Sequence, residues 1–234
     1  YVYVTYPGST DYFKIYDVSN PTAPTLVGSA VLAGDPVGGY VQGRYAYVLR
    51  NTSTLEIFDV SNPASPTSVG ILSTSGQDMY VQGRYVYITG GSPGLIIVDA
   101  SNPRSPEVVG SASALSTTNG GIYVQGRYAY VGYENSANGL QIFDVSNPAS
   151  PVSVGSASSS NNPSGVFVQG RYAYMARANG IQIYDVSNPA SPTSIASVSY
   201  GGTNMLDIYV QGRYAYLAEN TNNTIVVVDV SVPS

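Results

Sequence analysis

The sequence has no cysteine, histidine or tryptophan, and these absences exclude whole classes of chemistry. Without cysteine or histidine there is no disulfide framework, thiolate nucleophile, iron–sulfur cluster or ordinary zinc site. A Ser-His-Asp triad and an imidazole acid–base are excluded as well. Only carboxylate, lysine, tyrosine and serine side chains remain for catalysis, so we expect no enzyme activity, no cofactor and no metal.

Charge is also scarce. Only 10% of the 234 residues are charged, against about 25% in an ordinary soluble domain. The nine lysines and arginines are spread along a chain of net charge −5, so we expect no nucleic-acid partner. No apolar run approaches the roughly 18 residues of a membrane span. A surface made polar by neutral side chains is commoner outside cells, and we expect an extracellular or cell-surface protein.

Two sequence strings recur along the whole chain. Val-Gln-Gly-Arg-Tyr-Ala-Tyr recurs, with small changes, from Val41, Val81, Val124, Val168 and Val210. Asp-Val-Ser-Asn-Pro recurs, with some changes, from Asp17, Asp59, Asp99, Asp144, Asp185 and Asp229. These aspartates are 42, 40, 45, 41 and 44 residues apart, which is the length of a propeller blade made of short strands.

One repeat can be divided into four strands, here called A to D. Strand A, as at 207–210, is followed by a tight Gln-Gly turn and by strand B, as at 213–218. A variable loop leads to strand C, as at 55–59, which ends at the Ser-Asn-Pro turn, and strand D follows at 67–72. We therefore predict an all-β propeller of four-stranded antiparallel blades, forming one domain over 1–234 with repeats at roughly 1–36, 37–76, 77–120, 121–164, 165–206 and 207–234.

The two ends of the repeat pattern are incomplete. Strands B and C occur six times but strands A and D only five, so the first blade lacks strand A and the last lacks strand D. Six blades of about 42 residues would need about 18 residues more than the chain has. Three explanations stay open: a fragment of a longer propeller, a five-bladed closure, or head-to-tail completion between copies that builds a filament. The chain also begins at Tyr1 rather than methionine, from which we expect a processed or longer precursor.

The paired strings resemble a known family. An apolar strand ending in Asp-Val-Ser-Asn-Pro, preceded by a Tyr-Ala-Tyr-Val strand, is similar to the LVIVD-repeat β-propellers, and one copy reads Leu-Ile-Ile-Val-Asp at 95–99. The resemblance covers the whole chain and implies a bacterial or archaeal cell-surface propeller. The chain departs from the family pattern after the turn glycine, where it has arginine instead of asparagine. At the start of strand A an acidic residue remains only at Asp78 and Asp207, with glycine at 38, 121 and 165.

The A–B and C–D turns share one face of the predicted blades and are nearly identical in every repeat. Antiparallel pairing places the arginine that opens strand B beside the aspartate that ends strand C. We therefore predict a structural ring of ion pairs: Arg44–Asp59, Arg84–Asp99, Arg127–Asp144, Arg171–Asp185 and Arg213–Asp229. Anion binding by this ring is the alternative. The repeated Tyr-x-Tyr pairs of strand B are interpreted as packing between blades, with an aromatic platform for sugars as the alternative.

The B–C and D–A loops share the other face and vary in length and sequence. If the protein binds a ligand, we expect the site on this face, with candidates Tyr6, Asp35, Arg50, Tyr133, Glu134, Asn135, Arg177, Tyr200 and Glu219. Asn51 and Asn222 begin triplets that match the N-glycosylation pattern, which also arises by chance in a chain rich in Asn and Thr. Glu134 and Glu219 lie two blades apart, which argues against a paired-carboxylate glycosidase.

These features favour a non-enzymatic structural protein of the cell surface that associates with copies of itself through its incomplete terminal blades. The alternative is a binding module that recognises another surface protein or a glycan through its variable loops. A low charge favours the first hypothesis, because little like-charge repulsion opposes association between copies.

Overall fold

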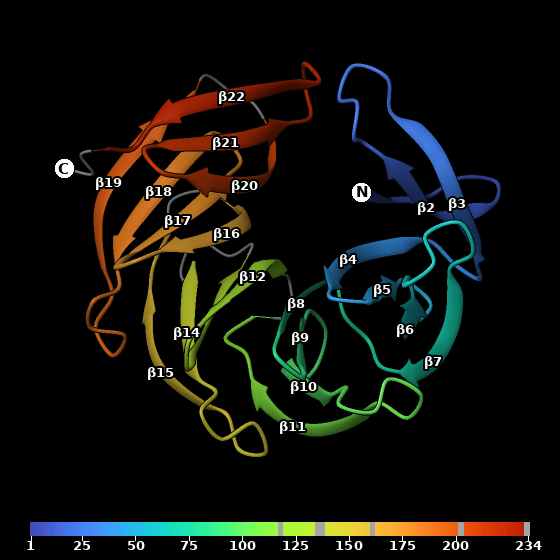
Figure 1. Cartoon of the computed structure of the whole chain (residues 1–234). Coiled ribbons are helices and arrows are strands. Elements are labelled where there is room, and N and C mark those ends of the chain that lie inside the picture. Colours follow the sequence, from blue (N-terminus) through green and yellow to red (C-terminus); the bar gives the residue numbers. More distant parts are fainter. Residues whose placement is uncertain (117–118, 134–138, 160–161, 201–203, 232–234) are drawn as a thin grey trace. The chain divides into compact units, whose positions relative to one another are not determined.

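The computed structural model describes residues 1–116, 119–133, 139–159, 162–200 and 204–231. All of its regular structure is β-strand, grouped in six antiparallel sheets. The four middle sheets have four strands each, and the first and last have three (Figure 1). The fold is a six-bladed β-propeller, as predicted, and the six sheets exclude the five-bladed alternative.

Each strand type recurs at the position that the repeat predicts. The A strands are β4 (Pro36–Gln42), β8 (Asp78–Gln82), β12 (Asn119–Gln125), β16 (Pro163–Gln169) and β20 (Met205–Gln211). The B strands are β1 (Val2–Tyr6), β5 (Tyr45–Arg50), β9 (Tyr85–Thr89), β13 (Tyr128–Tyr133), β17 (Tyr172–Arg177) and β21 (Tyr214–Glu219). The C strands are β2 (Asp11–Asp17), β6 (Thr54–Asp59), β10 (Gly94–Asp99), β14 (Leu140–Asp144), β18 (Gly180–Asp185) and β22 (Thr224–Asp229). The D strands are β3 (Thr25–Leu32), β7 (Thr67–Ser73), β11 (Glu107–Ser113), β15 (Val152–Ala157) and β19 (Thr193–Ser199).

The incomplete ends are also confirmed. Blade 1 has the strand order β1-β2-β3 and therefore begins at strand B, whereas blade 6 has the order β20-β21-β22 and ends at strand C. By their internal contacts the residues form two compact units, one of Tyr1–Ile88 with Ile97–Val109 and one of Thr89–Ile96 with Gly110–Ser234.

The core lies between neighbouring blades, because side chains alternate across each strand and so project from both faces of a blade. In the first unit, Phe13 and Ile15 of blade 1 pack against Ala46, Val48 and Phe58 of blade 2. In the second unit, blade 5 packs on blade 6 through an equivalent cluster whose members are Tyr174, Ile181 and Ile183 with Ile208, Val210, Ala215 and Leu217. The same pair of faces is therefore used in both units.

Two contacts join neighbouring blades at their turns. The Gln side chain of the Val-Gln-Gly-Arg turn donates to the turn-glycine carbonyl of the next blade, from Gln42 to Gly83 at 2.7 Å and from Gln169 to Gly212 at 3.0 Å. A glycine in strand D of one blade lies against the Asn-Pro turn of the next blade, at Gly28, Gly70, Gly110 and Gly155. A Cβ atom there would lie about 2 Å from a proline carbonyl oxygen, so only glycine fits without a shift of the backbone.

Candidate functional site

The structure contains all five predicted Arg–Asp ion pairs. Each arginine contacts the aspartate that ends strand C of its own blade, as in Arg84–Asp99 at 3.0 Å, and the other pairs are Arg44–Asp59, Arg127–Asp144, Arg171–Asp185 and Arg213–Asp229. The backbone supports the contact, because the arginine carbonyl accepts from the amide that follows the aspartate, as from Val60 to Arg44 at 2.8 Å.

Other groups in the turn also hold the charged side chains. The guanidinium lies over the ring of the next tyrosine, 4.9–5.4 Å from its centroid in the five copies. The aspartate accepts from the amide two residues on, as Asp144 does from Ser146 at 3.0 Å. The hydrogen bond from Arg127, followed by those from Ser146, lowers the pKa of Asp144 to about 2. These contacts favour the structural interpretation of the pairs over anion binding.

Four of the candidate binding residues lie in strands rather than in the predicted B–C loops. Arg50, Tyr133, Arg177 and Glu219 are the last residues of β5, β13, β17 and β21, and each residue is 1–5% exposed. Strand B is longer than the Tyr-x-Tyr pattern indicates, because strand C continues to pair with its end, as Thr54 does with Arg50. The expected loop residues are therefore part of the blade interior.

Local partners account for the charge of two of these buried groups. Arg50 Nη2 lies 3.4 Å from the carboxylate of Glu56, on the neighbouring strand. Glu219 accepts from the amides of Thr221 and Asn222 at 2.6 and 2.9 Å. Burial opposes ionisation of Glu219, but the hydrogen bonds from Asn222 and Thr221 outweigh it and lower its pKa. Burial shifts the pKa of Tyr133 upward and that of Arg177 downward.

The other candidates lie in different places. Tyr6 ends β1 and is 57% exposed, with Lys14 over its ring at 5.2 Å. Asp35 accepts from the side chain of Asn51 at 2.7 Å, one residue beyond the Pro36–Arg50 pair, so the structure brings Asp35 and the end of β5 together. Tyr200 is half-buried and follows β19. Glu134 and Asn135 lie outside the described residues.

The tyrosines of strand B divide into two kinds. The second of each pair is 3–4% exposed in four middle blades (Tyr47, Tyr87, Tyr130 and Tyr174), and its burial raises its pKa. The first of each pair lies under the arginine of the turn. Tyr130 packs in a cluster with residues of blade 5, and Tyr174 in one with residues of blade 6, so packing between blades, the interpretation made from sequence, describes these two rings.

Blade 6 presents an open apolar face. Its Tyr216, Ile225 and Val227 are 36%, 72% and 54% exposed. The residues at the same positions of blade 5, Tyr174, Ile181 and Ile183, are 0–3% exposed because blade 6 covers them. Tyr209 on β20 adds a further exposed ring to this face, which we call the blade 6 face (Tyr209, Tyr216, Ile225, Val227).

Blade 1 exposes the other of the two faces that pack between neighbouring blades. Val2 and Val4 of β1 are 45% and 36% exposed, whereas their counterparts Ala46 and Val48 in blade 2 are 1% exposed against blade 1. The pairing of β1 with β2 places Tyr16 beside Val2 and Lys14 beside Val4. We call this surface the blade 1 face (Val2, Val4, Lys14, Tyr16). The strands of the terminal blades have the same sequence pattern as those of the middle blades. In the sequence, only the number of strands in each repeat indicated that the two terminal blades are incomplete.

A family model for the LVIVD repeat matches the chain six times, at residues 1–31, 38–74, 75–113, 119–158, 162–199 and 202–234. The chain belongs to the LVIVD-repeat family. The matches follow the six blades, so the resemblance seen in the sequence is confirmed. No curated protein sequence matches this LVIVD-repeat chain.

Solved structures share the fold at low sequence identity. The periplasmic gluconolactonase PpgL of Pseudomonas aeruginosa is 14% identical with a TM-score of 0.78, over 96% of this chain and 74% of that one. The computationally designed Ika8 protein is 6% identical with a TM-score of 0.72, over 98% and 70% of the two chains. A chain of a nidogen/laminin complex is 10% identical with a TM-score of 0.68, over 99% and 90%. At such identities the likeness concerns the fold alone.

Proposed function

We propose that this LVIVD-repeat protein is a non-enzymatic structural protein of the cell exterior whose copies associate head to tail through their terminal blades. The observation that carries the proposal is the exposure, at both ends of the repeat, of apolar faces whose counterparts are buried in the middle blades. Exposed apolar patches of this kind mark interaction sites, because covering them removes apolar surface from water.

The two faces are also complementary. Within the chain, the Tyr174–Ile181–Ile183 face of blade 5 packs on the face of blade 6 that carries Ala215 and Leu217. The blade 6 face is equivalent to the Tyr174–Ile181–Ile183 face of blade 5. The blade 1 face is equivalent to the face of blade 6 that carries Ala215 and Leu217. One copy can therefore offer its blade 6 face to the blade 1 face of the next. A contact between two different faces repeats without limit when its rotation does not close, and it then builds a filament.

Three further features support a structural role over catalysis. The sequence lacks the cysteine and histidine of most acid–base, nucleophilic and metal chemistry. Among the described residues, no three acidic side chains gather closely enough to hold a metal ion. Four of the candidate ligand-binding residues are buried within blades. The placement outside the cell rests on the neutral polar composition. Within the described residues, no helix is long and apolar enough to cross a membrane.

Electron microscopy and light scattering of the purified chain over a range of concentrations test this proposal. We expect linear assemblies that lengthen with concentration. Ile225→Lys with Val227→Lys places two charges on the blade 6 face and should leave single particles. The matched control is Ile71→Lys, which changes an equally exposed residue (60%) on strand D of blade 2 and should assemble as the unmodified chain does. Single particles at every concentration for the unmodified chain would overturn the proposal.

A further inference from the structure

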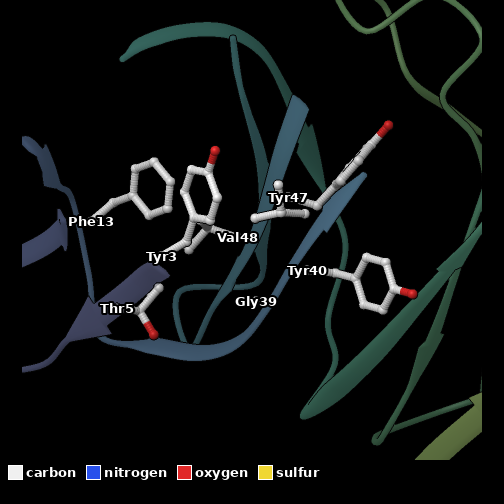
Figure 2. Close-up of a pocket in the computed structure, with 8 residues that line it drawn as sticks. Tyr3, Thr5, Phe13, Gly39, Tyr40, Tyr47 and Val48 are labelled. Atoms are coloured by element: carbon white, nitrogen blue, oxygen red, sulfur yellow. The ribbon is translucent and has the colours of Figure 1, made fainter. Parts of the chain in front are cut away.

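A cavity of about 360 Å³ opens beside β1, where blade 1 lacks strand A. On one side it is lined by Tyr3 and Thr5 of β1 with Phe13 of β2. On the other side lie Gly39 and Tyr40 of β4, together with Val41, Tyr47 and Val48. Figure 2 shows the Tyr3 and Thr5 side chains at this groove with Gly39 of the opposite strand.

In the complete blades a strand A aromatic occupies the corresponding position. Tyr40, which pairs with Tyr47 of strand B, lies 5.1 Å from the Tyr80 ring of the next blade. In the second unit the rings of Tyr123 and Phe167 are 4.7 Å apart, and those of Phe167 and Tyr209 are 5.1 Å apart. In these blades the strand A rings of neighbouring blades thus lie against one another. In blade 1 the cavity lies where the strand A ring would be.

We propose that this groove binds an extended polypeptide segment with an aromatic–Val–Gln sequence, which adds to the outer edge of β1 as an antiparallel strand. The register follows from the complete blades, where Tyr40 lies opposite Tyr47 and Val41 opposite Ala46. The incoming aromatic is then opposite Tyr3 and the incoming valine opposite Val2. The sequence that fits is the one the chain itself uses in all five A strands: Tyr-Val-Gln four times and Phe-Val-Gln once.

Two properties of the groove select such a segment. The outer edge of β1 pairs with no other strand in the described part of the chain, so its backbone groups are available to a new ladder. Gly39 has no side chain, so the wall of the groove opposite Thr5 stays open. A Cβ atom at position 39 would lie 3.7 Å from Thr5 Cγ2, which is ordinary contact without strain. A larger side chain at position 39 would project into the groove and compete with the incoming ring.

This inference rests on the proposed function only in that both make blade 1 a site of binding. The test uses a labelled peptide of the sequence at 205–211, Met-Leu-Asp-Ile-Tyr-Val-Gln, titrated by fluorescence anisotropy against the full chain. We expect saturable binding that weakens at least tenfold when the peptide carries Tyr209→Ser. Gly39→Leu in the protein should weaken binding to a similar degree, whereas Val31→Ser on the exposed strand D of blade 1 should not change it.

The titration is made on the Ile225→Lys, Val227→Lys chain, whose blade 6 face is blocked, so that the groove is measured without assembly. Equal binding of the two peptides, or no binding of either, would overturn the groove as a strand site, and neither result depends on the folding of a groove variant. Peptide binding together with an unmodified chain that never assembles would support the groove and contradict the proposed self-association.

Discussion

At the scale of single residues, the tightest constraint is the glycine of strand D. Gly155 faces the Pro189 carbonyl oxygen, which an added Cβ would approach to 2.1 Å. The equivalent residue of blade 5 is Ala196, opposite Ile183 as Gly155 is opposite Ile142. The sequence pattern alone did not indicate the role of this glycine, although a glycine recurs after Leu-Val, Ser-Val or Val-Val in four repeats.

This contact predicts unequal effects of two opposite substitutions. Gly155→Ala should lower the free energy of unfolding by about 1–3 kcal/mol, because the backbone of one blade must move away from the turn of the next. Ala196→Gly should cost less than about 1 kcal/mol, since it removes a methyl group and adds only the flexibility of glycine. Urea unfolding of both variants checks this, and equal losses would show that the close approach does not matter.

The ion pairs predict a pH dependence. The pKa of Asp144 is about 2 in the folded chain, below about 3.9 in an unfolded one, so its carboxylate stabilises the fold above about pH 4. That contribution is lost as the pH falls through the folded value. Arg127→Leu should therefore give a small loss of Tm near neutral pH that shrinks toward pH 2.

Thermal unfolding of both chains between pH 2 and pH 7 measures this difference. The control is Arg104→Leu, because Arg104 forms no ion pair with any described residue, and its effect should not vary with pH. A loss for Arg127→Leu that is the same at every pH would contradict a role for the guanidinium in lowering the pKa of Asp144.

At the scale of elements, the Gln of each A–B turn joins one blade to the next. Gln169 Nε2 donates to the Gly212 carbonyl at 3.0 Å, and Gln169→Glu would set a carboxylate against that oxygen. We expect a loss of about 1 kcal/mol or more in the free energy of unfolding. Gln211→Glu, in the corresponding turn of blade 6, should have little effect, because its side chain makes no such bond to the described residues. Equal losses in urea unfolding would refute the inter-blade role.

Strand types and their order were predictable from sequence because turn motifs punctuate every repeat at fixed positions. The ends of strand B were not, since the variable loop carries no recurring signal there. The candidates Arg50 and Arg177 illustrate the error: a charged residue after an apolar run is typical of a loop, yet here strand pairing continues and the side chains are buried. The contacts that the turn Gln and the strand D Gly make with the next blade could not be predicted from sequence either, because each contact joins residues of two different repeats.

At the scale of the whole molecule, four middle blades have both neighbours and two terminal blades have one each along the chain. Val2 and Val4 of blade 1, like Ile225 and Val227 of blade 6, are exposed at positions whose equivalents in blades 2 and 5 are buried. The low charge of the chain fits this arrangement, because like-charge repulsion between copies is weak. The sequence predicted which strands are missing, and the side-chain exposures locate the apolar faces that result.

The most direct test of head-to-tail association mixes two blocked chains. The first carries Ile225→Lys and Val227→Lys on the blade 6 face, and the second carries Val2→Lys and Val4→Lys on the blade 1 face. Each chain keeps one open face of a different kind, so each alone should be a monomer in analytical ultracentrifugation. Their equimolar mixture should form a 1:1 dimer and nothing larger. A mixture that stays monomeric while the unmodified chain assembles, or either blocked chain dimerising alone, would contradict a contact between the two terminal faces.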